Sequence, residues 1–162
     1  MSQSDKRAAR TAAAPDGRQH VGAPNEPRTE KGNETVTKTG VHTAHAPQPA
    51  GPYSQGIVAN GLLYTAGFGP QDPANRNAVA DNVADQTRQV LRNIQAVLAE
   101  RGLTLDDCLK TTVHLADLAD FAEFNAAYQE FFTEPYPVRT TVGSQLANIL
   151  VEIDVVAAFP ED

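Results

Sequence analysis

At 162 residues, the chain is long enough for one domain with a substantial core and hardly for two. Its formal net charge is −7, and residues 36–162 hold seven Lys and Arg against fifteen Asp and Glu. This acidity argues against a nucleic-acid partner, because a protein that follows a phosphate backbone needs a basic stripe. The single cysteine, Cys108, excludes an internal disulfide and fits a reducing compartment. With no apolar run of membrane-spanning length and no secretory signal, we expect a cytoplasmic protein without a membrane partner.

Residues 1–35 contain one valine and no Leu, Ile, Phe or Tyr. A segment so poor in large apolar side chains cannot offset its ordering entropy, so we predict a disordered tail before a domain spanning residues 36–162. The alternation in residues 35–39 predicts a first strand. His42 and His45 then precede two prolines, which favour extended chain over a helical metal-binding pair, and we expect no metal site.

A turn and a hairpin come next. Residues 51–56, Gly-Pro-Tyr-Ser-Gln-Gly, lead into an apolar run, and Asn60-Gly61 is the strongest hairpin signal in the chain. The return strand is predicted over residues 62–70, where Gly67 and Gly69 allow another strand or a ligand to approach the backbone closely.

A helix and a strand follow this hairpin. Residues 82–101 carry an apolar stripe of helical period, which Asp81 or Asn82 can cap and Gly102 can end. Residues 108–116 alternate as a strand. In that strand Leu109 belongs to the apolar face, and His114 lies on the polar face with no acid placed beside it by the sequence.

The last third of the chain predicts a second helix and two more strands. Asp120 has the spacing of a helix cap. The aromatic stripe behind it is more typical of a core than of a surface that stacks a cofactor; its members are Phe121, Phe124, Tyr128, Phe131 and Phe132. Strands are then predicted at residues 137–142 and 150–158, the second with Glu152 and Asp154 on its polar face.

Arg139 lies in the first of these strands and is the only Lys or Arg after Lys110. One interpretation is an edge arginine whose stem covers apolar surface while its head stays solvated. The other is a planar guanidinium that holds a carboxylate or phosphate by two parallel hydrogen bonds. The strand alone does not decide between them.

The predicted order is three strands, a helix, a strand, a helix and two strands. This order implies a mixed sheet with both helices on one face, an α+β layer architecture. The chain has no dinucleotide-binding, Walker or nucleophile-elbow pattern, and we expect no cofactor.

Five motifs, none of them specific alone, together resemble the RidA (YjgF) family over about residues 36–160. They are Gly51-Pro52-Tyr53-Ser54-Gln55-Gly56, Thr65-Ala66-Gly67, the segment from Asp120 to Phe132, Pro137-Val138-Arg139 and Val151-Glu152-Ile153-Asp154. The resemblance implies a chorismate-mutase-like (bacillus-type) fold and a homotrimer with clefts between subunits. It also implies the family's activity, the hydrolysis of 2-imino acids and enamines to 2-oxo acids and ammonia.

The resemblance assigns roles to residues of this chain. Arg139 matches the arginine that clamps the substrate carboxylate, and Glu152 matches the carboxylate that orients and partly deprotonates the attacking water. Tyr53 matches a cleft residue from a neighbouring subunit and completes the catalytic set. The remaining pocket residues expected to bind 2-imino and 2-oxo acids are Gly67, Phe68, Asn125 and Thr141. A plain salt bridge between Arg139 and Glu152 on adjacent strands would explain both residues without catalysis.

Two departures from the family pattern concern the pocket. Ala66-Gly67-Phe68 stands where many members read Ser-Gly-Gln, which removes a hydroxyl and an amide, and Phe68 favours a more apolar substrate side chain. Thr141 stands where a cysteine is common, so no reactive thiol is expected there. The leading hypothesis is thus a 2-iminoacid deaminase. The alternatives are a non-catalytic trimeric module that binds small carboxylates and, disfavoured by the acidity, a ribonuclease or translation inhibitor.

Overall fold

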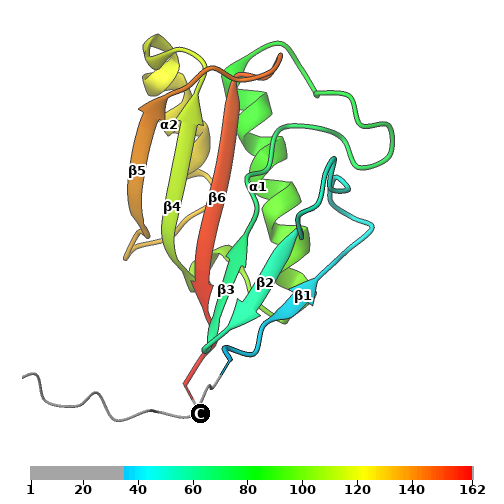
Figure 1. Ribbon diagram of the computed structural model, residues 1–162. Helices are drawn as coiled ribbons and strands as arrows, with labels where there is room; N and C mark the ends of the chain where they lie inside the picture. Colours follow the sequence, from blue (N-terminus) through cyan, green and yellow to red (C-terminus); the bar gives the residue numbers. More distant parts are fainter. Residues whose placement is uncertain (1–34, 162) are drawn as a thin grey trace, which may run out of the picture. The chain divides into compact units, whose positions relative to one another are not determined.

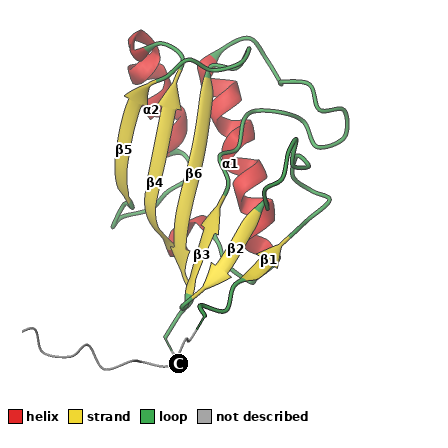
Figure 2. Cartoon of the chain, in the orientation of Figure 1, coloured by secondary structure: helices red, strands yellow, loops and turns green. Residues whose placement is uncertain are grey.

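The computed structural model describes residues 35–161. Within them the chain forms one mixed α+β domain, in which a six-stranded sheet carries two helices on one face (Figures 1 and 2). The tail predicted for residues 1–35 lies almost wholly outside the described residues. Neither helix of the described part is long and apolar enough to cross a membrane.

The strands follow the predicted order along the chain. They are β1 (Thr39–Val41), β2 (Gly56–Ala59), β3 (Leu62–Thr65), β4 (Cys108–Leu115), β5 (Val138–Gly143) and β6 (Val151–Ala158). In the sheet their order is β1-β2-β3-β6-β4-β5, with β5 parallel to β4 and every other pair antiparallel. The last strand therefore lies inside the sheet, and β5 is an edge strand (Figure 1).

The Asn60-Gly61 hairpin is confirmed. Both residues have positive φ, 51° and 74°, which is the backbone conformation of a two-residue turn whose twist matches that of the flanking strands. The strand after it is shorter than predicted, because β3 ends at Thr65. Beyond it, Phe68 makes only an isolated bridge to Ile153 of β6.

Helix α1 (Val83–Ala99) has the predicted cap and end. The Asn82 side chain accepts a hydrogen bond from the backbone N–H of Asp85 at 2.8 Å. At the other end Gly102 has a φ of 71°, a value that glycine adopts without steric cost. The apolar stripe of α1 packs on the sheet and is fully buried at Val90, Leu91, Ile94, Val97 and Leu98.

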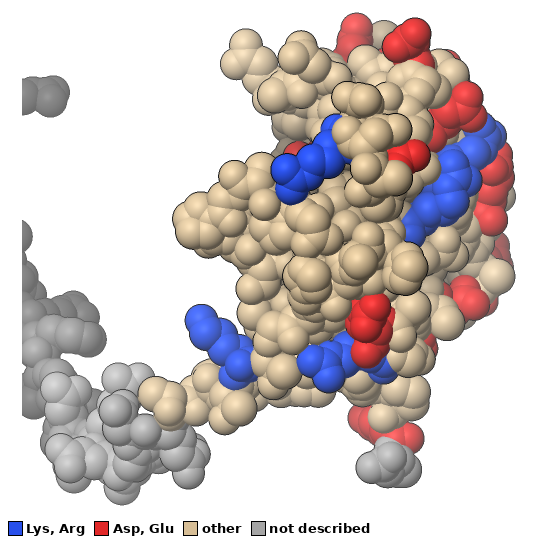
Figure 3. Space-filling model, turned by 90° about the vertical axis from the view of Figure 1, so that its right-hand side faces the viewer, with Lys and Arg blue, Asp and Glu red and all other residues tan. Residues whose placement is uncertain are grey.

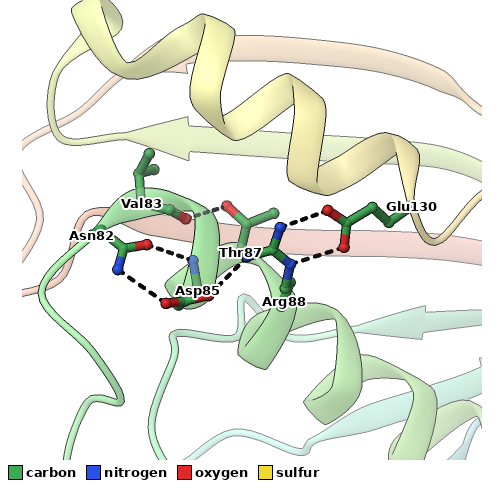
Figure 4. Close-up of polar contacts among 6 residues, drawn as sticks. All are labelled: Asn82, Val83, Asp85, Thr87, Arg88 and Glu130. Atoms are coloured by element: carbon green, nitrogen blue, oxygen red, sulfur yellow. Dashed lines mark hydrogen bonds and ion pairs between the residues drawn. The ribbon is translucent and has the colours of Figure 1, made fainter.

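Helix α2 (Phe121–Gln129) begins differently from the prediction. Asp120 makes no capping hydrogen bond, because it belongs to a short 3-10 turn, Leu118–Asp120, that Asp117 caps by accepting from the Ala119 N–H at 2.9 Å. Just after the end of α2, Glu130 is held by Arg88 of α1, whose Nε donates to it at 2.8 Å (Figure 4). This exposed contact connects α1 to the end of α2 on the same face of the sheet.

Two other strand predictions are also wrong in detail. Residues 35–38 lie outside the sheet, with Val36 63% exposed, and pairing with β2 begins only at Thr39. In β4 a bulge between Cys108 and Lys110 shifts the register. As a result Cys108 is buried and Leu109 is 54% exposed, the reverse of the predicted alternation.

Candidate functional site

Arg139 lies in edge strand β5 on the face that the helices cover. Its register partner in β4 is Thr111, which is fully buried and shares a 2.9 Å hydrogen bond with the hydroxyl of Tyr128 in α2. The strand alternation therefore turns Val138, 68% exposed, to the uncovered face of the sheet and Arg139 toward α2.

The Arg139 guanidinium is held by one amide and three aromatic rings. Its Nη2 donates to Oδ1 of Asn125 at 2.8 Å. Its central carbon lies 4.7 Å from the ring centre of Tyr128, 5.4 Å from that of Phe124 and 5.7 Å from that of Phe121. Such cation–π contacts orient a guanidinium without using its remaining N–H donors, so several donors stay available to an anion.

This guanidinium borders a pocket of about 400 Å³ at the edge of the sheet. Residues of α2 and of the segment before β5 line the rest of it: Asn125, Tyr128, Gln129, Tyr136 and Pro137. Asn125, one residue off the aromatic stripe, therefore lies beside Arg139, as expected if both residues belong to one pocket. Tyr136, which is 47% exposed, was missed by the sequence prediction, because no pattern separates it from an ordinary loop tyrosine.

Glu152 lies in a second pocket, of about 330 Å³, together with Tyr53, Gly67 and Phe68. Gly67 touches the carboxylate so closely that a Cβ built on it would lie 2.6 Å from Oε1 of Glu152. Only glycine fits against the acid in this arrangement. The close approach at Gly67, predicted to be to another strand or a ligand, is made instead to the side chain of Glu152.

Tyr53 is 53% exposed, and its loop is fixed by a buried glutamine. Gln55, 1% exposed, accepts from the Thr43 N–H at 2.7 Å and donates to the carbonyl oxygens of Thr43 at 3.1 Å and Pro47 at 3.0 Å. The Tyr53 hydroxyl accepts from the Ala50 N–H at 3.0 Å. Gln55 belongs to the same six-residue motif as Tyr53, but no sequence pattern indicates that its side chain organises the loop.

Phe68 and Thr141 are less well placed to bind a substrate than predicted. The Phe68 side chain is 4% exposed and belongs to the core cluster, so it offers little surface to a ligand. Thr141 lies on the same face of β5 as Arg139, opposite Val113 of β4, and borders neither of the two pockets described for residues 35–161.

The two groups of candidate residues lie on opposite faces of the sheet. Glu152 is opposite His114 of β4 in register, on the uncovered face, whereas Arg139 faces the helices. Strand β4 separates β5 from β6, and the ion pairs among the described residues do not include one between Arg139 and Glu152. A plain salt bridge on adjacent strands is therefore excluded as the explanation of these two residues.

His114 has an acidic neighbour that the sequence did not indicate. Its register partner across the antiparallel pair is Glu152, and its Nδ1 shares a 2.7 Å hydrogen bond with Oγ of Ser144. The strand alternation placed His114 on the correct face, but the pairing of β4 with the last strand cannot be read from local pattern.

Among residues 35–161, the other two histidines, His42 and His45, and the surface charge indicate no second site. His42 shares a 2.7 Å hydrogen bond with Gln48, and residues 35–161 contain no cluster of His, Cys, Asp and Glu suited to a metal ion. On the face drawn in Figure 3, Lys and Arg side chains lie in separate groups among neutral and acidic ones. That face carries no continuous basic stripe of the kind that nucleic-acid binding requires.

Comparison with known proteins gives consistent matches. A family model described as Endoribonuclease L-PSP matches residues 43–159. A RutC family protein of Pyrococcus horikoshii is 45% identical over 119 residues, which cover 72% of this chain and 94% of that protein. The 2-iminobutanoate/2-iminopropanoate deaminase of Salmonella typhimurium is 39% identical over 127 residues, covering 75% of this chain and 98% of that enzyme.

A solved structure is similar to this chain in fold as well as in sequence. The crystal structure of E. coli TdcF with bound serine superposes with a TM-score of 0.70 at 34% identity, covering 75% of this chain and 99% of that one. Because the family model spans most of the chain and each of these relatives covers more than two thirds of it, the chain belongs to the endoribonuclease L-PSP (YjgF/RidA) family.

Proposed function

We propose that the protein is a hydrolytic deaminase that converts 2-imino acids and their enamine tautomers to 2-oxo acids and ammonia. Its sites are completed between copies of the chain in a homotrimer of chorismate-mutase-like fold. The relative in Salmonella typhimurium named as such a deaminase supports the reaction class, and serine bound to TdcF supports a ligand that carries a carboxylate.

The reaction needs one water and no oxidant. Water adds to C2 of the imine while the C=N electron pair moves to nitrogen, which takes a proton. The resulting carbinolamine loses ammonia as the C2–O bond becomes a carbonyl. Glu152 takes the proton from the attacking water and returns a proton to the departing nitrogen, and Arg139 holds the carboxylate with its remaining donors.

The observation that supports this proposal most strongly is that Arg139 and Glu152 lie on opposite faces of the sheet. Arg139 and Asn125 lie on the helix-covered side at the sheet edge, and Glu152, Gly67 and Tyr53 lie around a pocket on the other side. One substrate molecule can meet both groups only if they come from different copies. The structure of the single chain therefore supports a shared cleft and gives it a direct test.

The test is complementation between two inactive variants. Arg139→Ala and Glu152→Gln are prepared separately, then unfolded together and refolded at equal concentrations. In randomly mixed trimers about one quarter of the clefts combine an intact Arg139 with an intact Glu152 from another copy. Ammonia release above the spontaneous rate, from imines generated in situ by an amino-acid oxidase, is expected to recover to about that fraction of the wild-type value.

Two results would contradict the proposal. If each variant is inactive and the mixture stays inactive although mixed trimers form, the site is not shared between copies. If the wild type accelerates ammonia release from no imine yet binds 2-oxo acids, the chain is a carboxylate-binding module.

Nuclease activity that persists in Arg139→Ala would be a contaminant. A cytoplasmic location, where the single thiol of Cys108 stays reduced, is part of the proposal.

A further inference from the structure

Arg76 is held in an uncommon backbone conformation in the loop between β3 and α1. Its φ is 63°, a value that residues other than glycine adopt rarely. The Arg76 N–H donates to the carbonyl oxygen of Asp72 at 2.8 Å, and the Asp72 N–H donates to that of Asn77 at 2.8 Å. Non-glycine residues kept in this region cluster at ligand-binding sites, so the position calls for a functional explanation.

The start of this loop is anchored to the core. Asn93 of α1, which is 1% exposed, donates to the carbonyl oxygens of Gly69 at 3.1 Å and of Gln71 at 2.9 Å. Gln71 also makes an isolated bridge with Ala78 across the loop. Arg76 is thus presented from a loop whose base is fixed.

The Arg76 side chain lines the pocket that contains Glu152 and Tyr53. It is the only cationic residue among those lining this pocket, and Glu152 is the only anionic one. The ion pairs among residues 35–161 all involve Arg88, so Arg76 pairs with no described carboxylate, Glu152 included. A guanidinium that lines the same pocket as the candidate catalytic acid therefore keeps its donors for a ligand.

We propose that Arg76 recognises a second negative charge on the substrate, so that the preferred substrates are 2-imino acids whose side chain carries its own carboxylate. This inference rests on the proposed function. There Arg139 of another copy holds the carboxylate common to all 2-imino acids, and Arg76 lies on the Glu152 side of the cleft. An anion that reaches Arg76 then belongs to the variable end of the substrate.

The chemistry of the pocket favours an anionic side chain over an apolar one. Phe68, the residue expected to favour a more apolar substrate side chain, is buried in the core. Beside apolar residues such as Ile149, the pocket wall carries the amide of Gln71 and the hydroxyl of Tyr53. A planar guanidinium binds a carboxylate through two parallel hydrogen bonds, which a neutral side chain of the same length cannot use.

The experiment compares two substrates that differ only in the terminal group. L-Glutamate and L-norvaline are oxidised in situ to 2-iminoglutarate and 2-iminopentanoate, and kcat/KM for ammonia release is measured for wild type, Arg76→Gln and Arg76→Lys. Arg92→Gln, a change at an exposed arginine of α1 that lines neither described pocket, is the control. Binding of 2-oxoglutarate and 2-oxopentanoate by calorimetry gives a readout that does not depend on catalysis.

We expect the wild type to prefer the dicarboxylic compound in both measurements. Arg76→Gln should lower that preference by about tenfold, leave the neutral substrate unchanged and be partly rescued by Arg76→Lys. An equal loss for both substrates would mean that Arg76 acts on Glu152 or on the common carboxylate, and would overturn the inference. A preference for the dicarboxylic compound that is unchanged in Arg76→Gln would overturn it as well. If no imine is turned over, the proposed function fails, and the binding ratio still tests Arg76.

Discussion

Gly67→Ala tests whether the position of the Glu152 carboxylate matters for turnover. A Cβ at residue 67 would lie 2.6 Å from Oε1 of Glu152, 3.0 Å from Cδ and 3.2 Å from Cγ. Ordinary contact begins at 3.4 Å, so the carboxylate has to retreat by about 0.8 Å. Because the atom that must move is the far end of a flexible side chain, the fold can absorb the change.

A displacement of this size should cost catalysis much more than stability. Misplacing a reacting group by about 1 Å can slow a reaction about a hundredfold, so we expect kcat to fall between about tenfold and a hundredfold. The melting temperature should change by only a few degrees, about the shift that 1 kcal/mol produces in a domain of this size. Ammonia release from in situ 2-iminobutanoate and thermal unfolding followed by circular dichroism measure the two effects.

Gly40→Ala is the matched control. Gly40 lies in β1, and a Cβ there would meet no atom within 4 Å. This variant should keep wild-type turnover and stability. Full activity of Gly67→Ala would refute the assignment of Glu152 as the base. A collapse in stability without any loss of turnover in the folded fraction would refute the claim that the side chain yields and the fold does not.

Three further predictions concern charged side chains. Arg139→Lys should lose most turnover while the fold stays intact, since an ammonium lacks the planar fork; retention of more than half the wild-type kcat/KM would contradict this. Glu152→Gln should still bind 2-oxobutanoate yet release ammonia about a hundredfold more slowly, and calorimetry beside the turnover assay separates these outcomes. Hydrogen bonds from Arg88 lower the pKa of Glu130 below its ordinary 4.5. The contact between Arg88 and ionised Glu130 therefore stabilises the folded state fully above pH 4.5, and this stabilisation is lost as the pH falls below that value. The difference in melting temperature between wild type and Glu130→Gln should accordingly shrink from pH 6 toward pH 3.

The local sequence pattern was sufficient to predict each element whose structure depends on its own residues alone. The Asn60-Gly61 turn needs positive φ at both residues, and few sequences other than this one supply it. The stripe of α1 and the alternation of β6 are read from periods of 3.6 and 2 residues, and the structure follows both. The same alternation placed Arg139 on the face opposite Val138.

Local pattern failed where the structure depends on pairing. The bulge at Cys108 inverts the faces at the start of β4, and it is set by the pairing with β6, a strand more than forty residues later in the chain. Asp120, the residue expected to cap α2, makes no capping hydrogen bond because it belongs to the 3-10 turn Leu118–Asp120. Arg76 was not singled out by the sequence because an arginine in a polar loop shows no period and no motif.

The proposed sharing of the site between copies follows from the arrangement of the sheet. Strand β5 carries Arg139 at the sheet edge, and β4 stands between it and Glu152, so no rotamer change within one chain brings the two side chains together. The face that bears Glu152 is not covered by the described helices (Figure 2) and exposes large apolar side chains, with Tyr64 at 44% and Val138 at 68% exposure. An exposed apolar surface of this kind is typical of a protein–protein interface. Covering it with a second copy would bury these side chains and bring residues of another chain toward Glu152. The same contact would then supply both the stability of the assembly and the missing half of the site.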